Sequence, residues 1–187
     1  MIDKKQIKDG ASTILNGLGI KNWETDENFK DTPKRIADAF FEVCGSLNLD
    51  TEYQFKKLFE STYSSTNNQM IVIDKIREYS ICPHHLFSYS MDVKIGYIPQ
   101  GKVIGLSKLP RLVKLLANKP VLQETLTEDI ANALMEYLVP LGCGVIVKAH
   151  HGCISVRGVK QIDAITTTSI MKGCFLVNPV KLEFLSL

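Results

Sequence analysis

Residues 91–97, Met-Asp-Val-Lys-Ile-Gly-Tyr, carry the clearest fold signal in the chain. Apolar side chains occupy every second position, which is the period expected of a β-strand with one buried face and one wet face. Working outward, further short apolar or alternating segments predict strands at residues 70–73, 102–106, 143–150 and 153–159. A tight turn at His151-Gly152 is expected to join the last two.

Apolar residues spaced three to four apart predict helices between and before these strands. They lie at residues 3–19, from Thr32 to about residue 43, at 107–116 and at 121–138. Thr32 and Ser107 are suitable helix caps, and Pro33 suits a first helical turn. The order of elements predicts an α+β fold, with an antiparallel sheet covered by helices on one face. We expect an N-terminal helical region at residues 1–60, and a strand-rich domain at 61–187 that begins with a polar loop at 61–69.

Composition excludes several classes of protein. A formal net charge of +2 over 187 residues argues against a general nucleic-acid binder, whose affinity needs a concentrated basic surface. No segment approaches the roughly 20 apolar residues that span a bilayer, and the N-terminus has no apolar signal core. Five cysteines suggest no disulfide framework, and Cys44, Cys143 and Cys174 lie among apolar residues as expected of buried thiols. We therefore expect a cytoplasmic protein.

All four histidines lie close to a cysteine, in Cys82-Pro83-His84-His85 and in His150-His151-Gly152-Cys153. Cysteine and histidine are the side chains that suit zinc. Cys82 and His85 are three residues apart, so one turn can present both to one ion, and Cys153 supplies a third ligand. Three protein ligands leave a position for water, whose pKa zinc lowers towards about 7. This pattern predicts a catalytic zinc site.

Two histidines remain beside the predicted metal. His84 and His151 are candidates for proton transfer, because imidazole titrates near neutrality. If residues 151–157 are extended, His151, Cys153, Ser155 and Arg157 share one face. Two alternatives stay open: a purely structural metal site, and a histidine pair that only makes hydrogen bonds.

Gly105 to Arg111 places Ser107, Lys108 and Arg111 at a helix start. Unpaired backbone N–H groups there favour anions, and both cations bind phosphate well. The alternative is a capped helix with a solvated charged face.

Together these motifs resemble the GTP cyclohydrolase I family over roughly residues 30–187. The resemblance is carried by Asp-Thr-Pro-Lys-Arg (31–35), Cys-Pro-His-His (82–85), Ile-Gly-Tyr-Ile-Pro (95–99), Gly-Leu-Ser-Lys-Leu-Pro-Arg (105–111), Leu-Gln-Glu-Thr-Leu-Thr (122–127) and His-Gly-Cys-Ile-Ser-Val-Arg-Gly (151–158). It implies a tunnelling fold, assembled as a homo-oligomer, usually a decamer, with active sites at subunit interfaces.

The resemblance also implies roles for individual residues. Cys82, His85 and Cys153 correspond to zinc ligands, and His84 and His151 to the catalytic histidines. Gln123 and Glu124 correspond to the pair that recognises guanine. Ser107, Lys108, Arg111 and Arg157 correspond to the triphosphate clamp, with Arg35 a further member from the same or a neighbouring subunit.

The implied reaction opens the imidazole ring of GTP with zinc, giving formate and 7,8-dihydroneopterin triphosphate at the start of pterin biosynthesis. The chain departs from the family pattern at Pro83, where glutamate is usual, at Thr125, where arginine is usual, and at 86–92, which lacks a Gly-Lys pair. Three hypotheses follow: a GTP cyclohydrolase I, a zinc paralogue acting on another purine or pterin, and a non-catalytic nucleotide-binding member.

Overall fold

A computed structural model describes all 187 residues as two compact units, Met1–Leu49 and Asp50–Leu187. The division lies before the helix at residues 51–59, which the sequence-based division assigned to the N-terminal region. That helix packs within the second unit. No helix is long and apolar enough to cross a membrane.

The first unit is helical. It contains α1 (Lys4–Gly17), α2 (Thr32–Val43) and a short 3-10 turn, η1 (Gly45–Asn48). Asp3 caps α1 by accepting from two backbone N–H groups. Asp38 on α2 pairs at 2.8 Å with Lys4 and with Lys34. The helix predicted from Thr32 is confirmed, although Asp31 rather than Thr32 occupies the capping position.

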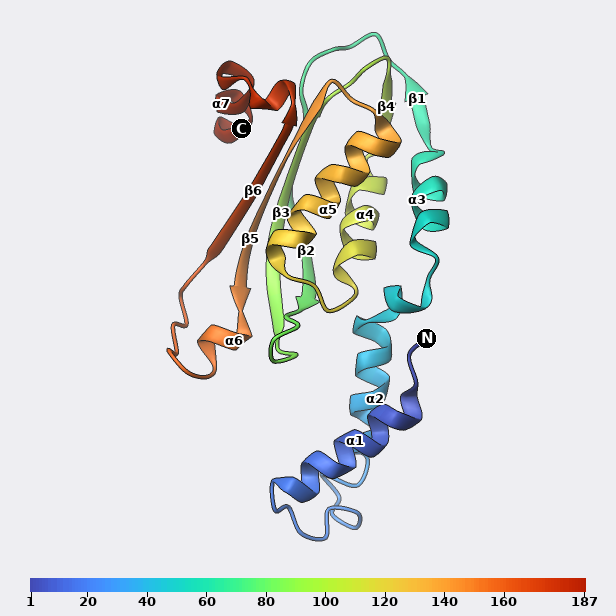
Figure 1. The fold of residues 1–187 in the computed structure, drawn as a ribbon, viewed down its shortest axis with the longest axis vertical. Helices are drawn as coiled ribbons and strands as arrows, with labels where there is room; N and C mark the ends of the chain where they lie inside the picture. Colours follow the sequence, from blue (N-terminus) through green and yellow to red (C-terminus); the bar gives the residue numbers. More distant parts are fainter. The chain divides into compact units, whose positions relative to one another are not determined.

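The second unit is built on a four-stranded antiparallel sheet in the order β2-β3-β5-β6 (Figure 1). Its strands are β2 (Ile71–Ile81), β3 (Ser88–Ile98), β5 (Gly142–His151) and β6 (Thr166–Gly173). A small second sheet pairs β1 (Thr62–Ser64) with β4 (Lys102–Ile104). The predicted strand at 91–97 is the centre of β3, and its alternate apolar residues are buried as expected.

Three helices, α3 (Thr51–Phe59), α4 (Lys108–Ala117) and α5 (Gln123–Ala133), bury their apolar faces in the core of this unit. α5 continues as a π-helical turn, η2 (Leu134–Leu138), so the prediction of one helix over 121–138 is close to the structure. α4 packs against β2, and α5 packs against β5 and β6 (Figure 1). The predicted α+β fold, with an antiparallel sheet and helices on one face, is confirmed.

Two segments differ from expectation. Residues 62–64, predicted as part of a loop, form β1. The strand predicted at 153–159 is wrong, because a short helix, α6 (Gly152–Ser155), follows β5 and the last strand begins at Thr166. The predicted common face of His151, Cys153, Ser155 and Arg157 is therefore wrong as well. The chain can turn sharply there because Gly152 has no Cβ. A Cβ at this position would lie only 2.8 Å from the Ser88 carbonyl oxygen.

The C-terminus covers part of the second face of the sheet. After β6 come η3 (Cys174–Leu176) and α7 (Asn178–Ser186), which carry the fully buried Phe175 and Phe184. These rings lie over Gly96 and Gly144, which are register partners on β3 and β5. Both glycines leave room on the sheet for the two rings.

Candidate active site

The turn between β2 and β3 carries the first cluster of candidate ligands. The Cys82 N–H donates to the Phe87 carbonyl at 2.8 Å, and the Leu86 N–H donates to the Cys82 carbonyl at 2.9 Å. Leu86 adopts a left-handed conformation, with φ of 56°, that closes the turn. Cys82 is buried, whereas His84 and His85 are exposed. The turn therefore fixes one thiol at the edge of the core and presents two imidazoles outside it.

The end of β5 brings the second cluster to the same place. His151 is the register partner of Tyr89 on β3, and α6 begins at the next residue. Because Gly152 permits close approach to Ser88, the chain bends and places Cys153 in the first turn of α6. Residues about seventy positions apart in sequence thus meet at one end of the sheet.

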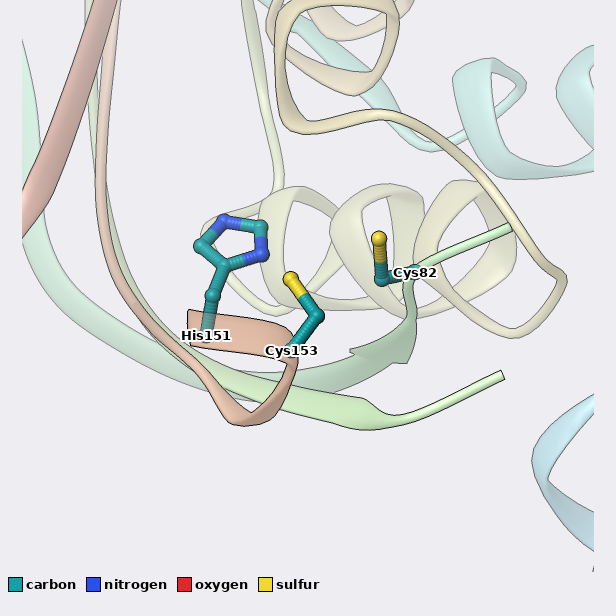
Figure 2. A group of neighbouring side chains, drawn as sticks. All are labelled: Cys82, His151 and Cys153. Atoms are coloured by element: carbon teal, nitrogen blue, oxygen red, sulfur yellow. The ribbon is translucent and has the colours of Figure 1, made fainter. Parts of the chain in front are cut away.

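Potential metal-ligand atoms of Cys82, His151 and Cys153 all lie within 4.8 Å of one another. Figure 2 shows the Cys153 sulfur directed towards the His151 ring, with the Cys82 side chain on the other side of Cys153. Two thiols and an imidazole form a donor set that suits zinc, and the spacing fits one ion. The residues present therefore fit the metal that the sequence predicts.

His85, the predicted third ligand, lies outside this group. Its Nε2 is 3.0 Å from Arg157 Nη1, and its ring stacks with Phe87 at 6.3 Å between centroids. His84 is closer to the cysteines, with Nδ1 at 3.8 Å from Cys82 Sγ. In this structure His151, rather than His85, is the imidazole that lies close to both thiols.

The cluster opens into a cavity of about 190 Å³. Six predicted site residues line it: Cys82, His84, Gln123, Glu124, His151 and Cys153. Pockets that enclose a drug-sized molecule usually measure about 300–1,000 Å³. One chain therefore offers room for only part of a nucleoside triphosphate.

Burial governs the protonation of the cluster. It lowers the pKa of His151, and the nearby Glu124 carboxylate opposes this only in part. Burial, followed by the neighbouring Cys82 thiol, raises the pKa of Cys153, while Arg157 works in the opposite direction. Without a metal the site therefore favours a neutral imidazole and a protonated thiol, and metal binding must displace protons from sulfur.

His151 is held by two contacts. Its ring stacks on Tyr89 with centroids 4.4 Å apart, and its Nε2 lies 2.8 Å from Gln123 Oε1. Tyr89 is itself fixed, because its hydroxyl donates to the Val121 carbonyl at 3.1 Å. Gln123 is 1% exposed and begins α5. Tyr89 was missed by the sequence analysis; extending the alternation of 91–97 by one period, back to residue 89, would have found it.

The predicted phosphate-binding residues are not part of this cavity. Ser107 stands at the N-terminus of α4 with no side-chain capping bond, followed by Lys108 and the exposed Arg111. Arg157 contacts His85. Arg35 belongs to the first unit, where it pairs with Asp31 at 3.7 Å. Within one chain the structure joins the metal and guanine candidates but leaves these cations outside the cavity.

Comparison with known proteins adds an independent finding. The family profile described as GTP cyclohydrolase I matches residues 7–187. The chain belongs to the GTP cyclohydrolase I family. The predicted family and the enzyme class that goes with it are confirmed.

Relatives named GTP cyclohydrolase 1 support the same assignment over almost the whole chain. The protein of Campylobacter curvus is 41% identical over 98% of this chain and 95% of its own length. The protein of Hydrogenobaculum sp. is 40% identical over 100% of this chain and 98% of its own length. The protein of Clostridium perfringens is 39% identical over 94% of this chain and 92% of its own length. Among solved structures, the apo form of an archaeosine synthase QueF-Like is 21% identical, with a TM-score of 0.47 over 56% of this chain and 93% of that one.

Proposed function

We propose that this member of the GTP cyclohydrolase I family uses zinc to open the imidazole ring of GTP by hydrolysis. The products are formate and 7,8-dihydroneopterin triphosphate. The observation that carries the proposal is the convergence of Cys82, His151 and Cys153 in a cavity that Glu124 also lines. A soft donor set beside a carboxylate suits a metal enzyme that acts on a purine ring.

Cys82 and Cys153 are the two thiolate ligands in this proposal. The third ligand is His85, as the Cys-x-x-His spacing and the family resemblance imply. The alternative ligand set has His151 in place of His85. The proximity of His151 to both thiols supports this alternative. When bound, zinc supplies Lewis acidity and activates water near neutral pH.

Glu124 recognises the guanine end of the substrate. It is exposed, lies in the first turn of α5, and lines the cavity next to His151. A carboxylate accepts hydrogen bonds from two neighbouring N–H donors, which matches the ring N–H and amino group of guanine. Ser107, Lys108, Arg111, Arg157 and Arg35 bind the triphosphate, because hydroxyl and cationic groups form strong hydrogen bonds with phosphate.

His151 and His84 move protons during the reaction. His151 is proposed to protonate N7 of guanine as the C8–N9 portion of the ring is hydrolysed, and its fixed ring suits that role. His84 lines the same cavity, is exposed, and serves the later rearrangement of the ribose.

Two features support assembly of the tunnelling fold as a homo-oligomer, with a decamer as the proposed state. β2 and β6 form the two open edges of the antiparallel sheet, so a second copy can extend it by edge pairing. The cavity of one chain is small, and the proposed phosphate ligands lie outside it. A neighbouring chain that brings such residues to the cavity would complete a site at the subunit interface.

The test is to incubate zinc-loaded protein with GTP and to measure formate release and dihydroneopterin absorbance. Cys153→Ser should lose zinc and turnover together. Zinc content distinguishes the two ligand sets. If His85 is the third ligand, His85→Ala should lose zinc, whereas His151→Ala should keep zinc but lose ring opening. Bound zinc and GTP without formate would instead indicate the non-catalytic alternative. Turnover of a different purine or pterin would indicate a paralogue with altered specificity.

A further inference from the structure

The orientation of the Gln123 side-chain amide follows from the chemistry of its neighbours. Its nitrogen lies 3.0 Å from the Val147 carbonyl, 3.0 Å from the Thr166 carbonyl and 3.1 Å from Thr168 Oγ1. A backbone carbonyl can only accept a hydrogen bond, so the atom that faces two of them must be the NH₂ group. Flipping the amide would place its oxygen against two backbone carbonyl oxygens, neither of which can donate.

A chain of hydroxyl groups agrees with this orientation. Thr127 Oγ1 donates its only proton to the Gln123 backbone carbonyl at 2.7 Å. Thr168 Oγ1, at 2.6 Å from Thr127 Oγ1, must therefore be the donor in that pair. Its lone pairs remain free to accept from the Gln123 amide. The hydroxyl protons therefore agree with an amide whose NH₂ group faces Val147, Thr166 and Thr168.

The remaining amide atom, Gln123 Oε1, faces His151 Nε2 at 2.8 Å. An amide oxygen can only accept, so Nε2 of His151 must carry a proton. A neutral imidazole then has its lone pair on Nδ1. Stacking on Tyr89 fixes the plane of the ring, and the amide fixes its rotation.

We propose that Gln123 is a positioning residue, which locks His151 as the Nε2–H tautomer and aims Nδ1 at the reacting centre. The sequence-based role of Gln123 in guanine recognition is replaced, because its buried amide is fully used by protein groups. Guanine recognition then rests on Glu124. The inference builds on the proposed function of the same site, and it holds whether Nδ1 binds metal or first accepts a proton and then passes it to N7 of guanine.

The first test is the tautomer of His151 in zinc-loaded wild-type protein, by ¹⁵N NMR of histidine-labelled protein. His151→Ala assigns the resonance among the four histidines. We expect one protonated nitrogen, Nε2, and one unprotonated or metal-bound nitrogen, Nδ1. A protonated Nδ1 with a bare Nε2 would overturn the proposal, and this result needs no catalytic turnover. A failure of the GTP reaction is therefore distinguishable from a failure of this inference.

The second test is Gln123→Met, which keeps the length of the side chain but removes both polar atoms. We expect mixed tautomers of His151 and a fall in kcat of about 10- to 100-fold, as for other residues that orient a site histidine. KM for GTP should change far less. Thr168→Val is the matched control, because it removes one partner of the amide but leaves both carbonyl acceptors and the His151 contact. A rise in KM with unchanged kcat and an unchanged tautomer in Gln123→Met would support direct guanine recognition instead.

Discussion

Gly96→Ala tests how the C-terminal helix is held on the second face of the sheet. A Cβ at this position would lie 2.6 and 2.7 Å from two ring carbons of Phe184. Phe184 is fully buried and packs edge-on against Phe175 at 5.4 Å, so its ring has no free space into which to move. The substitution therefore forces the sheet and α7 apart.

The size of the effect follows from these distances. Carbon atoms pack best about 3.5–4.0 Å apart, so the ring must retreat by about 1 Å. Overpacking of this kind costs about 1–3 kcal/mol. The upper limit is complete release of the Phe184 ring, about 3–5 kcal/mol by analogy with a Phe→Ala truncation. We expect a loss of about 2–3 kcal/mol, which lowers Tm by about 4–12 °C for a chain of this size.

Thermal and urea unfolding of four variants provide the assay. Gly96→Ala, Phe184→Ala and the double variant form a cycle, in which Gly96→Ala should cost little once the ring is absent. Gly10→Ala is the control, because nothing lies within 4 Å of its Cβ and it sits inside α1. There alanine should stabilise by about 0.5–1 kcal/mol. Equal costs of Gly96→Ala with and without Phe184 would refute the reasoning.

Three further predictions concern the active-site end of the sheet and the core. Gly152→Ala should lower the zinc content, because the new Cβ would lie 2.8 Å from the Ser88 carbonyl oxygen and displace α6. Atomic absorption measures the zinc, and an unchanged circular dichroism spectrum shows that the fold is kept. Leu86→Gly should raise the free energy of unfolding in urea by up to about 1 kcal/mol. A left-handed conformation costs a leucine about 1–2 kcal/mol, and glycine avoids this cost, but glycine loses more backbone entropy on folding, which offsets part of the gain. In metal-free protein at pH 8, mass spectrometry should show iodoacetamide modifying Cys153 well before Cys143, because burial raises the pKa of the Cys143 thiol to about 12.

Local patterns were sufficient for the two central strands, β3 and β5, and for the helices α4 and α5, whereas the prediction at 70–73 covered only the start of β2. Alternation at 91–97 and the four-residue repeat at 121–138 each describe a segment that is buried on one side, so periodicity reports them directly. The segment after His151 has no such pattern. Its course depends on Gly152 approaching Ser88, a contact between residues far apart in sequence. A strand was therefore predicted where α6 lies, and β6 was missed.

The site shows the same limit. Paired Cys and His motifs were enough to predict that Cys82 and Cys153 meet beside an imidazole, since metal chemistry restricts the choice of ligand. Which imidazole stands next to the thiols was not predictable, because it depends on how the turn after Cys82 directs His84 and His85. The role of Gln123 could not be predicted from the sequence for a related reason. Its amide partners lie on β5 and β6, 24 to 45 residues away, and only the register of those strands brings them together.

Pro83 stands where the resemblance to the family leads us to expect a glutamate, and the turn explains how the backbone accommodates proline there. The two hydrogen bonds that close the turn use the N–H groups of Cys82 and Leu86, so neither requires a donor at residue 83. Proline restricts φ there and favours an extended conformation for the preceding residue, Cys82, which directly follows the end of β2. Relative to the expected glutamate, proline lacks a carboxylate next to the candidate metal ligands. Because the backbone needs nothing from that carboxylate, Pro83→Glu should leave the fold intact, and any gain or loss of turnover would report on the side chain alone.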